Sequence, residues 1–168
     1  MNIVLIGFMC SGKSRVGRDL AARLGWTFHD TDDIVAKTSG TRVPELIRKR
    51  GEPAFRELEA VAVQTLADVD HSVIATGGGV PLNPENMKTL GKNGQIVWLK
   101  VSPRSVLHRA GDMGARPLID PSDPQGSITR RLREREPLYE AATFSVDTDA
   151  LSAAQVVEKI LTLFPGIK

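Results

Sequence analysis

Short apolar runs alternate with stretches of helical periodicity along the whole chain. The apolar runs are brief and bounded by polar or glycine-bearing turns, as is typical of buried strands, and they lie near 2–6, 26–30, 72–76, 95–100 and 144–147. Apolar positions recur with helical spacing in the segments near 13–24, 32–39, 43–50, 53–68, 84–90, 103–110, 125–141 and 152–163. This alternation predicts a three-layer α/β/α fold, in which helices cover both faces of a central five-stranded parallel sheet.

The first expected strand leads directly into a glycine-bearing loop. From Gly7 to Ser14 the sequence reads GFMCSGKS, which fits the pattern G-x-x-x-x-G-K-[ST]. In such a loop, backbone N–H groups and the start of the next helix bind a polyphosphate, the lysine lies at the β- and γ-phosphates, and the serine binds Mg²⁺. The loop therefore predicts a P-loop site for a nucleoside triphosphate. A chance match is the alternative, but the strand before the loop and the helical period after it disfavour it.

Length and composition indicate one compact domain. The chain has 168 residues, a formal net charge of +2 and one cysteine, so we expect a single domain, 1–168, without an internal disulfide. The first residues lack a secretory signal, which favours a cytoplasmic location. Aromatic residues make up 5% of the chain and are scattered, and no apolar run approaches the roughly 20 residues that cross a bilayer. We expect a monomer that binds neither nucleic acid nor membranes.

Three consecutive glycines follow the strand near 72–76. They are Gly77, Gly78 and Gly79. Ligands of open parallel sheets bind beyond the carboxyl ends of the strands, and glycine permits a close approach of the backbone to a ligand. The three glycines are therefore expected to border a ligand site. An ordinary surface turn is the alternative.

A stretch rich in glycine and proline, at about 111–125, predicts a mobile lid. Its composition buries little apolar surface, and long loops in compact domains are often functional. Phosphoryl transfer requires that water be excluded and that a cation face the γ-phosphate. Arg116 is the candidate for that cation. The alternative is a disordered connector with an incidental arginine.

Carboxylates and arginines complete the candidate chemistry. Asp30 and Asp32 follow the second strand, where carboxylates are suited to hold hydrated Mg²⁺ and to accept a hydroxyl proton, although Asp32 or Asp33 could simply cap the next helix. Arg56 and Arg135 present planar forks that suit a carboxylate. On glutamate-rich helices, however, either arginine is more often a solvated member of an ion pair.

Together these motifs resemble the shikimate kinases, small P-loop enzymes related to the nucleoside monophosphate kinases. The resemblance covers nearly the whole chain, with GFMCSGKS at 7–14, FHDTD at 28–32, GEPAFRELE at 51–59, TGGGV at 76–80, RPLI at 116–119, REPLY at 135–139 and VDT at 146–148. It implies ATP- and Mg²⁺-dependent phosphorylation of the 3-hydroxyl of shikimate to shikimate 3-phosphate, on the route to chorismate and the aromatic amino acids. The acceptor-binding region is expected at about 31–60.

The resemblance also implies roles for the motif residues. The catalytic residues are Asp32, Lys13 and Arg116, and Asp32 is the proton acceptor, for which an ordinary carboxylate pKa would suffice. Shikimate is bound by Asp32, Arg56, Gly77, Gly78, Gly79 and Arg135, while Glu59 orients Arg56. The nucleotide is bound by Cys10, Ser11, Gly12, Lys13, Ser14, Arg15, Arg109 and Arg116. Mg²⁺ is held by Ser14 and Asp30.

Several positions depart from the family pattern or stay ambiguous. Cys10 stands where glycine is frequent, and Arg15 where threonine is common. A positive φ would strain a cysteine at position 10, and its thiol is either reactive or inert. Arg109 is expected to stack on the adenine, but no proline follows 146–148 to form the opposite wall. The arginine run at 130–135 is typical of a charged helix face.

Three other functions are less favoured. Gluconate kinase shares the phosphate loop and general architecture, but the combination of FHDTD, FR-x-x-E, GGG and RPLI favours shikimate. A nucleotide-binding module without turnover would have no chemical need to keep Lys13, Asp32, Arg56, Arg116 and Arg135 together. A nucleotide-switch protein would need paired switch loops, which the sequence does not show.

Overall fold

The computed structural model describes residues 1–111 and 116–167. Its strands are β1 (Asn2–Ile6), β2 (Thr27–Asp30), β3 (Ser72–Ala75), β4 (Gly94–Lys100) and β5 (Phe144–Asp147). Its helices are α1 (Lys13–Leu24), α2 (Thr31–Ser39), α3 (Val43–Gln64), η1 (a 3₁₀ helix, Val80–Leu82), α4 (Pro84–Gly91), α5 (Pro103–Ala110), α6 (Pro124–Tyr139) and α7 (Ala153–Leu163). The expected α/β architecture with five strands is confirmed.

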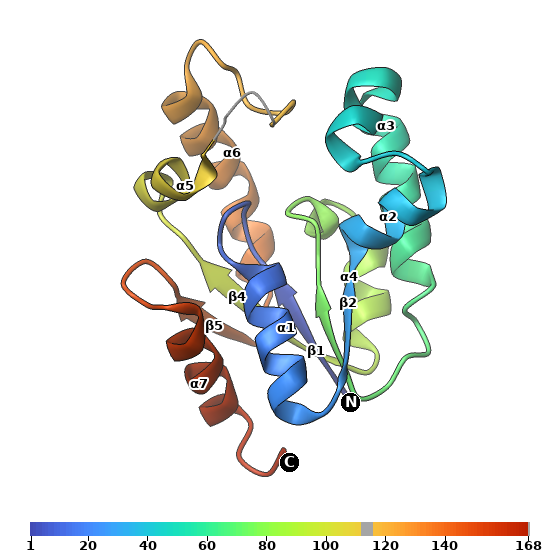
Figure 1. The fold of residues 1–168 in the computed structure, drawn as a ribbon, viewed down its shortest axis with the longest axis vertical. Helices are drawn as coiled ribbons and strands as arrows, with labels where there is room; N and C mark the ends of the chain where they lie inside the picture. Colours follow the sequence, from blue (N-terminus) through green and yellow to red (C-terminus); the bar gives the residue numbers. More distant parts are fainter. Residues whose placement is uncertain (112–115, 168) are drawn as a thin grey trace.

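The five strands form one parallel sheet in the order β2-β3-β1-β4-β5 (Figure 1). Successive side chains of a strand point to opposite faces of the sheet. Because helices cover both faces at the central strand β1, all of its side chains are buried. Ile3 and Leu5 pack against buried residues of α1 and α7. Val4 and Ile6 pack against buried residues of α3, α4, α5 and α6. The three layers predicted from the sequence are thus present.

Local hydrogen bonds explain where several helices begin and end. Helix α1 ends before Gly25, which adopts the left-handed conformation at φ 66°, as glycine does without a steric penalty. Helix α5 begins after Ser102, whose hydroxyl accepts a hydrogen bond from the N–H of Ser105. Helix α7 begins with a capping box between Ser152 and Gln155. Such caps satisfy N–H groups that would otherwise lack partners.

Helix α3 differs from the sequence prediction. The segments expected at 43–50 and 53–68 form one long element, and its backbone is non-helical only at Gly51, with φ 82° and ψ 166°. The helix ends at Gln64, where i→i+3 hydrogen bonds tighten the following turn. The kink at Gly51 matters for the site, because both halves of α3 contribute side chains to the same cavity.

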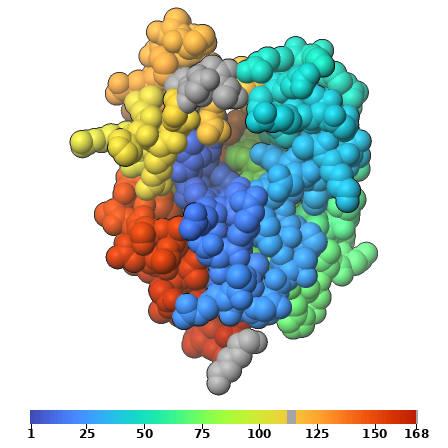
Figure 2. All heavy atoms as spheres, in the orientation of Figure 1, coloured from blue at the N-terminus to red at the C-terminus, as the bar shows by residue number. Residues whose placement is uncertain are grey.

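The loops that follow β1, β2 and β3 meet at the carboxyl edge of the sheet, because the strands run parallel. At this edge the α2–α3 segment (cyan) and the α5–α6 segment (yellow to orange) stand on opposite sides of the loop that follows β1 (Figure 2). None of the described helices is both long enough and apolar enough to cross a membrane.

Candidate active site

The loop between β1 and α1 has the backbone of a phosphate-binding cradle. Gly7 and Gly12 have φ values of 142° and 93°, which favour glycine. A Cβ on Gly7 would also lie 2.5 Å from the carbonyl oxygen of Leu99. The side chain of Lys13 folds back over the loop, where its ammonium donates to the carbonyl oxygens of Gly7 and Phe8, each at 2.8 Å. Burial lowers the pKa of Lys13 from 10.5 to about 8, although nearby carboxylates oppose the shift.

Cys10 adopts the left-handed conformation that the sequence analysis considered, with φ 60°. A residue with a Cβ is strained there, so the loop stores some backbone strain at this position. The sulfur accepts a hydrogen bond from the guanidinium of Arg116 at 3.4 Å. Arg116 is thereby held against the phosphate loop, as a cation facing the γ-phosphate would need to be.

Ser14 and Asp30 lie together beside the loop. The hydroxyl of Ser14 donates to Oδ2 of Asp30 at 2.6 Å, while Oδ1 of Asp30 accepts the N–H of Asp32 at 3.0 Å. Asp30 is therefore the cap of α2, and the alternative in which Asp32 or Asp33 caps this helix is wrong. The two oxygen donors of Ser14 and Asp30 fit Mg²⁺, which prefers few protein oxygens together with phosphate and water.

The side chain of Asp32 is left free by this cap. Its Oδ1 is buried and has no hydrogen-bond partner among the described residues. Burial, reinforced by the charges of Asp30 and Glu59, raises the pKa of Asp32 from 3.8 to about 6, against the opposing charges of Lys13 and Arg56. An ordinary carboxylate pKa would suffice for the role that the resemblance implies, and the burial that raises this pKa cannot be seen in the sequence.

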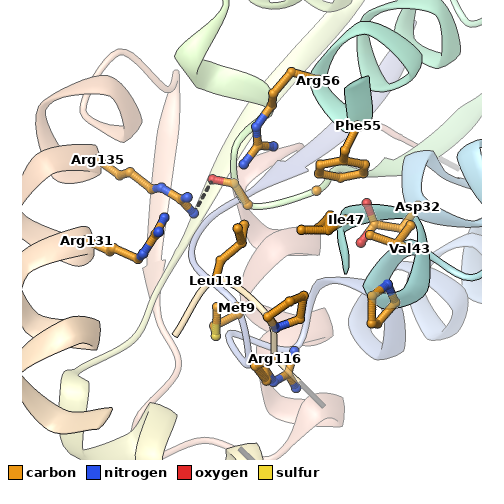
Figure 3. A pocket seen from close by; sticks show the side chains of 14 residues that line it. Met9, Asp32, Val43, Ile47, Phe55, Arg56, Arg116, Leu118, Arg131 and Arg135 are labelled. Atoms are coloured by element: carbon orange, nitrogen blue, oxygen red, sulfur yellow. Dashed lines mark hydrogen bonds between the residues drawn. The ribbon is translucent and has the colours of Figure 1, made fainter. Parts of the chain in front are cut away.

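A cavity of about 180 Å³ lies beside Asp32 (Figure 3). Its walls combine apolar side chains with four guanidinium groups, and the residues that line it are Met9, Asp32, Val43, Pro44, Ile47, Phe55, Arg56, Gly77, Gly78, Arg116, Pro117, Leu118, Arg131 and Arg135. Asp32 is the only carboxylate among these residues. A cavity with this composition suits a small anionic molecule that has an apolar ring face.

Arg56 occupies one wall of the cavity and is held by two glutamates. It donates from Nη1 to Glu59 at 2.8 Å and from Nη2 to Glu52 at 2.9 Å. The side chain of Glu59 is 1% exposed, and burial raises its pKa although the ion pair with Arg56 opposes this. Glu59 thus fixes the direction of Arg56, as the resemblance implied. The ion-pair alternative is also right for Arg56, yet its guanidinium still faces the cavity (Figure 3).

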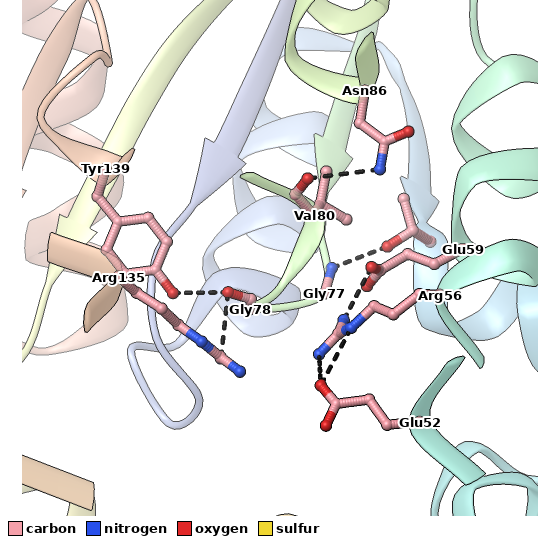
Figure 4. A network of polar contacts seen from close by, with 10 residues as sticks. Glu52, Arg56, Glu59, Gly77, Gly78, Val80, Asn86, Arg135 and Tyr139 are labelled. Carbon is pink, nitrogen blue, oxygen red and sulfur yellow. Dashed lines mark hydrogen bonds and ion pairs between the residues drawn. The ribbon is translucent and has the colours of Figure 1, made fainter. Parts of the chain in front are cut away.

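Arg135 is buried on the opposite wall, with 6% of its surface exposed. Its Nη1 donates to the carbonyl oxygen of Gly78 at 3.3 Å, and its guanidinium lies 5.5 Å from the ring of Phe8. The hydroxyl of Tyr139 donates to the same carbonyl at 2.6 Å (Figure 4). The alternative of a solvated ion pair is therefore wrong for Arg135, which is directed into the site by a carbonyl and an aromatic ring.

The three glycines after β3 lie at the cavity, but they are not equivalent. The N–H of Gly77 already donates to Oγ1 of Thr31 at 2.8 Å, so this N–H group is already occupied, although Gly77 itself lines the cavity. Gly79 lies outside the cavity lining, and a Cβ at this position would come within 2.2 Å of the Arg56 guanidinium. Val80 then begins η1, which the sequence pattern does not predict, with a hydrogen bond to the carbonyl of Gly77.

A second hollow follows the phosphate loop toward β5. Arg109 lines this hollow together with Cys10, Ser11, Gly12 and Arg15. The guanidinium of Arg109 donates to the carbonyl oxygen of Thr148 at 2.7 Å and to its hydroxyl at 3.1 Å. The nucleotide-binding residues expected from the resemblance are thus brought together, with Arg109 anchored to the end of β5.

The expected lid at 111–125 is described only in part. Residues 112–115 lie outside the described residues. In the described part, Ile119 is buried in the core beside the sheet, whereas the residues at 120–123 are exposed. The buried Ile119 anchors the segment that carries Arg116 and Leu118 to the cavity.

Sequence reasoning missed several residues that line the cavity and also Tyr139, which does not line it but binds the Gly78 carbonyl at its wall. Tyr139 carried a signal, since it lies one helical turn after Arg135 within REPLY. The apolar side chains of Val43, Ile47 and Phe55 gave none, because at helical spacing they are indistinguishable from core residues. Arg131 was counted with the charged helix face, although it lines the cavity.

Comparisons with known proteins agree with this geometry. The family model described as shikimate kinase matches residues 9–164. The shikimate kinase of Moorella thermoacetica is 47% identical over 159 residues, which cover 95% of this chain and 91% of the relative. The solved shikimate kinase from Acinetobacter baumannii in complex with shikimate has a TM-score of 0.92 at 35% identity, covering 96% of this chain and 91% of that one. The shikimate kinase from Aquifex aeolicus gives 0.85 at 36% identity, with 99% and 97% covered.

A gluconokinase from Sinorhizobium meliloti is more distant. Its TM-score is 0.64 at 20% identity, covering 96% of this chain and 89% of that one, so the likeness extends to the fold alone.

Proposed function

Because the chain belongs to the shikimate kinase family, we propose that its cavity binds shikimate with the carboxylate toward Arg56 and Arg135 and the 3-hydroxyl toward Asp32. The enzyme transfers the γ-phosphoryl group of ATP to this hydroxyl and releases ADP and shikimate 3-phosphate. The reaction belongs to the route to chorismate and the aromatic amino acids.

One observation carries this assignment. The cavity shares a wall with a further hollow, which lies over the phosphate loop beside Lys13 and Ser14 and differs from the hollow that Arg109 lines. The shared wall is made of Met9, Asp32, Gly77, Gly78 and Arg116. A hydroxyl on one side of this wall and a terminal phosphate on the other meet beside Asp32 and Arg116. Phosphoryl transfer depends on bringing these two groups together more than on a strong base.

Asp32 positions the reacting hydroxyl and accepts its proton. Its unpartnered Oδ1 needs a donor, and the 3-hydroxyl of shikimate supplies one. The proton leaves the hydroxyl oxygen as the new O–P bond forms and passes to Oδ1. A pKa of about 6 keeps this carboxyl ionised at neutral pH while making it a better proton acceptor than an ordinary aspartate.

Two cations stabilise the moving group. Lys13 already lies inside the loop, where its ammonium exchanges carbonyl partners for phosphate oxygens. Arg116 approaches from the other side, held by Cys10. Negative charge spreads over the phosphoryl oxygens in the transition state, so cations fixed in advance stabilise it strongly.

Ser14 and Asp30 would hold Mg²⁺, Ser14 through its hydroxyl and Asp30 directly or through water. When bound, Mg²⁺ neutralises charge on the β- and γ-phosphates. Among the described residues no group of three or more candidate metal ligands occurs. Two protein oxygens are nevertheless enough, because Mg²⁺ usually completes its shell with phosphates and water.

The remaining expectations belong to the same proposal. The guanidinium of Arg109 stacks on the adenine in the hollow toward β5. The protein acts in the cytoplasm as a single-domain monomer, 1–168, and its partners are the small molecules shikimate and ATP. Neither nucleic acid nor membrane takes part.

The test is an ADP-release assay with purified protein, ATP and Mg²⁺, run with shikimate, with gluconate and without acceptor. We expect turnover with shikimate only, and none when Mg²⁺ is chelated. Equal ADP release in all three reactions would contradict phosphorylation of an acceptor. Turnover with gluconate alone would show that the acceptor is gluconate and not shikimate.

A further inference from the structure

Helix α6 presents two arginines, one helical turn apart, to the acceptor cavity. Arg131 and Arg135 both line the cavity and point into it side by side from the same wall (Figure 3). Residues at positions i and i+4 share one face of a helix. Arg130 and Arg133 are exposed on other faces of this helix. The run at 130–135 is therefore not a uniform solvated face.

The three arginines at this end of the cavity differ in how far their charges are already balanced. Arg56 is paired with two carboxylates, those of Glu52 and Glu59. Arg135 donates to one neutral carbonyl, that of Gly78, and faces an aromatic ring. The guanidinium of Arg131 makes no hydrogen bond, ion pair or ring contact with any described residue, although the residue is partly buried.

This arrangement leaves an excess of positive charge on one wall. Two like charges at i and i+4 repel each other, and burial raises the cost of leaving them unpaired. Asp32 is the only carboxylate among the residues that line the cavity, and the proposed function places it at the opposite end of the acceptor. An incoming carboxylate is therefore attracted more strongly by Arg131 and Arg135 than by Arg56, whose charge is already compensated.

We propose that Arg131 is an additional acceptor-binding residue, which forms with Arg135 a paired guanidinium site for the carboxylate of the substrate. The inference depends on the proposed function for the identity of that substrate. A carboxylate has lone pairs enough to accept from more than one fork. Arg56 still contacts the carboxylate from the other wall, and the pair on α6 adds the uncompensated charge that distinguishes acidic from neutral acceptors.

The first experiment compares Arg131→Gln with Arg133→Gln. Both variants remove one positive charge from α6, but Arg133 is exposed outside the cavity. We expect Arg131→Gln to raise the KM for shikimate about tenfold, the loss of roughly 1.4 kcal/mol of charge-assisted binding, with kcat and the KM for ATP nearly unchanged. Arg133→Gln should leave all three constants within about twofold of the wild type, because solvent and salt screen the interaction of an exposed charge with a substrate in the cavity.

The second experiment replaces the substrate carboxylate by its methyl ester. The ester should be a poor acceptor for the wild type, and Arg131→Gln should lose little further activity with it. Equal KM values for Arg131→Gln and Arg133→Gln would overturn the inference. Arg131 would then act no differently from any positive charge on α6, either by attracting the anionic substrate from a distance or not at all. The same fold-loss with ester and acid would overturn it as well, since Arg131 would then act on something other than the carboxylate.

A binding measurement separates this inference from the proposed function. Shikimate should raise the melting temperature of the wild type and of Arg133→Gln, and it should raise that of Arg131→Gln much less. This shift needs no turnover, so a protein that binds shikimate without phosphorylating it would contradict only the proposed function. Urea unfolding should show that Arg131→Gln is at least as stable as the wild type, because the substitution removes a repelling charge.

Discussion

The phosphate loop and the acceptor cavity are built in opposite ways. The loop is one continuous segment, Gly7–Ser14, and it binds through backbone N–H groups, a helix terminus and a lysine folded over its own carbonyls. The cavity takes only Met9 from this loop and is otherwise assembled from distant segments of the chain, namely α2, both halves of α3, the turn after β3, the segment around Arg116 and α6. It binds through side chains, above all guanidinium groups.

This difference determines how each region responds to mutation. A backbone cradle tolerates many side chains but depends on a few glycines and one cation. A cavity of separate side chains loses affinity contact by contact, and a loss away from the wall shared with the phosphate loop affects only the acceptor. Substitutions in the two regions should therefore separate nucleotide effects from acceptor effects, and the following predictions test that separation.

The largest effect is expected at Lys13. Replacing it by methionine keeps most of its packing but removes the cation that faces the moving phosphoryl group. We expect kcat to fall at least about 1,000-fold, with weaker ATP binding and nearly unchanged shikimate binding. Steady-state kinetics and calorimetric titration with each substrate measure this. Loss of shikimate binding as large as that of ATP would show that the two regions are not separable.

Asp32→Asn should be the next most severe change. The variant keeps the size of the side chain but removes the proton acceptor, so kcat should fall about 100-fold. The dissociation constant of the nucleotide, measured without acceptor, should stay within about twofold of the wild type. Unchanged turnover would remove Asp32 from the reaction.

The same substitution should stabilise the nucleotide-free protein. The pKa of Asp32 is about 6 when folded against an ordinary 3.8, so its contribution to stability is full below pH about 4 and is lost as the pH rises through about 6. We expect Asp32→Asn to be more stable than the wild type by about 3 kcal/mol at pH 7, with little difference at pH 4. Urea unfolding across this pH range measures it. A difference that is constant with pH would contradict the raised pKa.

Arg56→Ala should give the smallest of these effects. The KM for shikimate should rise about tenfold, since a charge-assisted contact is lost and two glutamates are left without their partner. The KM for ATP should not change. Glu59→Gln is the matched test of how Arg56 is oriented, because it keeps the shape of the side chain but removes the charge of the ion pair with Arg56. We expect it to raise the KM for shikimate less than Arg56→Ala does. Equal losses for ATP and shikimate in Arg56→Ala would indicate misfolding.

The same comparison explains what could be predicted from the sequence. The sheet and the phosphate loop could be predicted from local signals, because apolar runs, helical periods and the glycine-lysine-serine pattern each involve residues that are close together in the sequence. For the cavity, the local signals indicated only candidates such as Arg56 and Arg135, each of which could equally have been a solvated member of an ion pair. Their joint role came from the resemblance to a family. The raised pKa of Asp32, the occupied N–H of Gly77 and the inward direction of Arg131 depend on packing between distant segments, which single-sequence patterns do not contain.

The parallel sheet has a practical consequence at the edge opposite the reaction. Strand β1 begins at Asn2 on that edge, and α7 returns to it before ending at Leu163, so both ends of the chain lie away from the site (Figure 1). A tether at either end would leave the entrance for substrates unobstructed. The enzyme is therefore well suited to immobilisation on a solid support, or to fusion with another catalyst that works on its product.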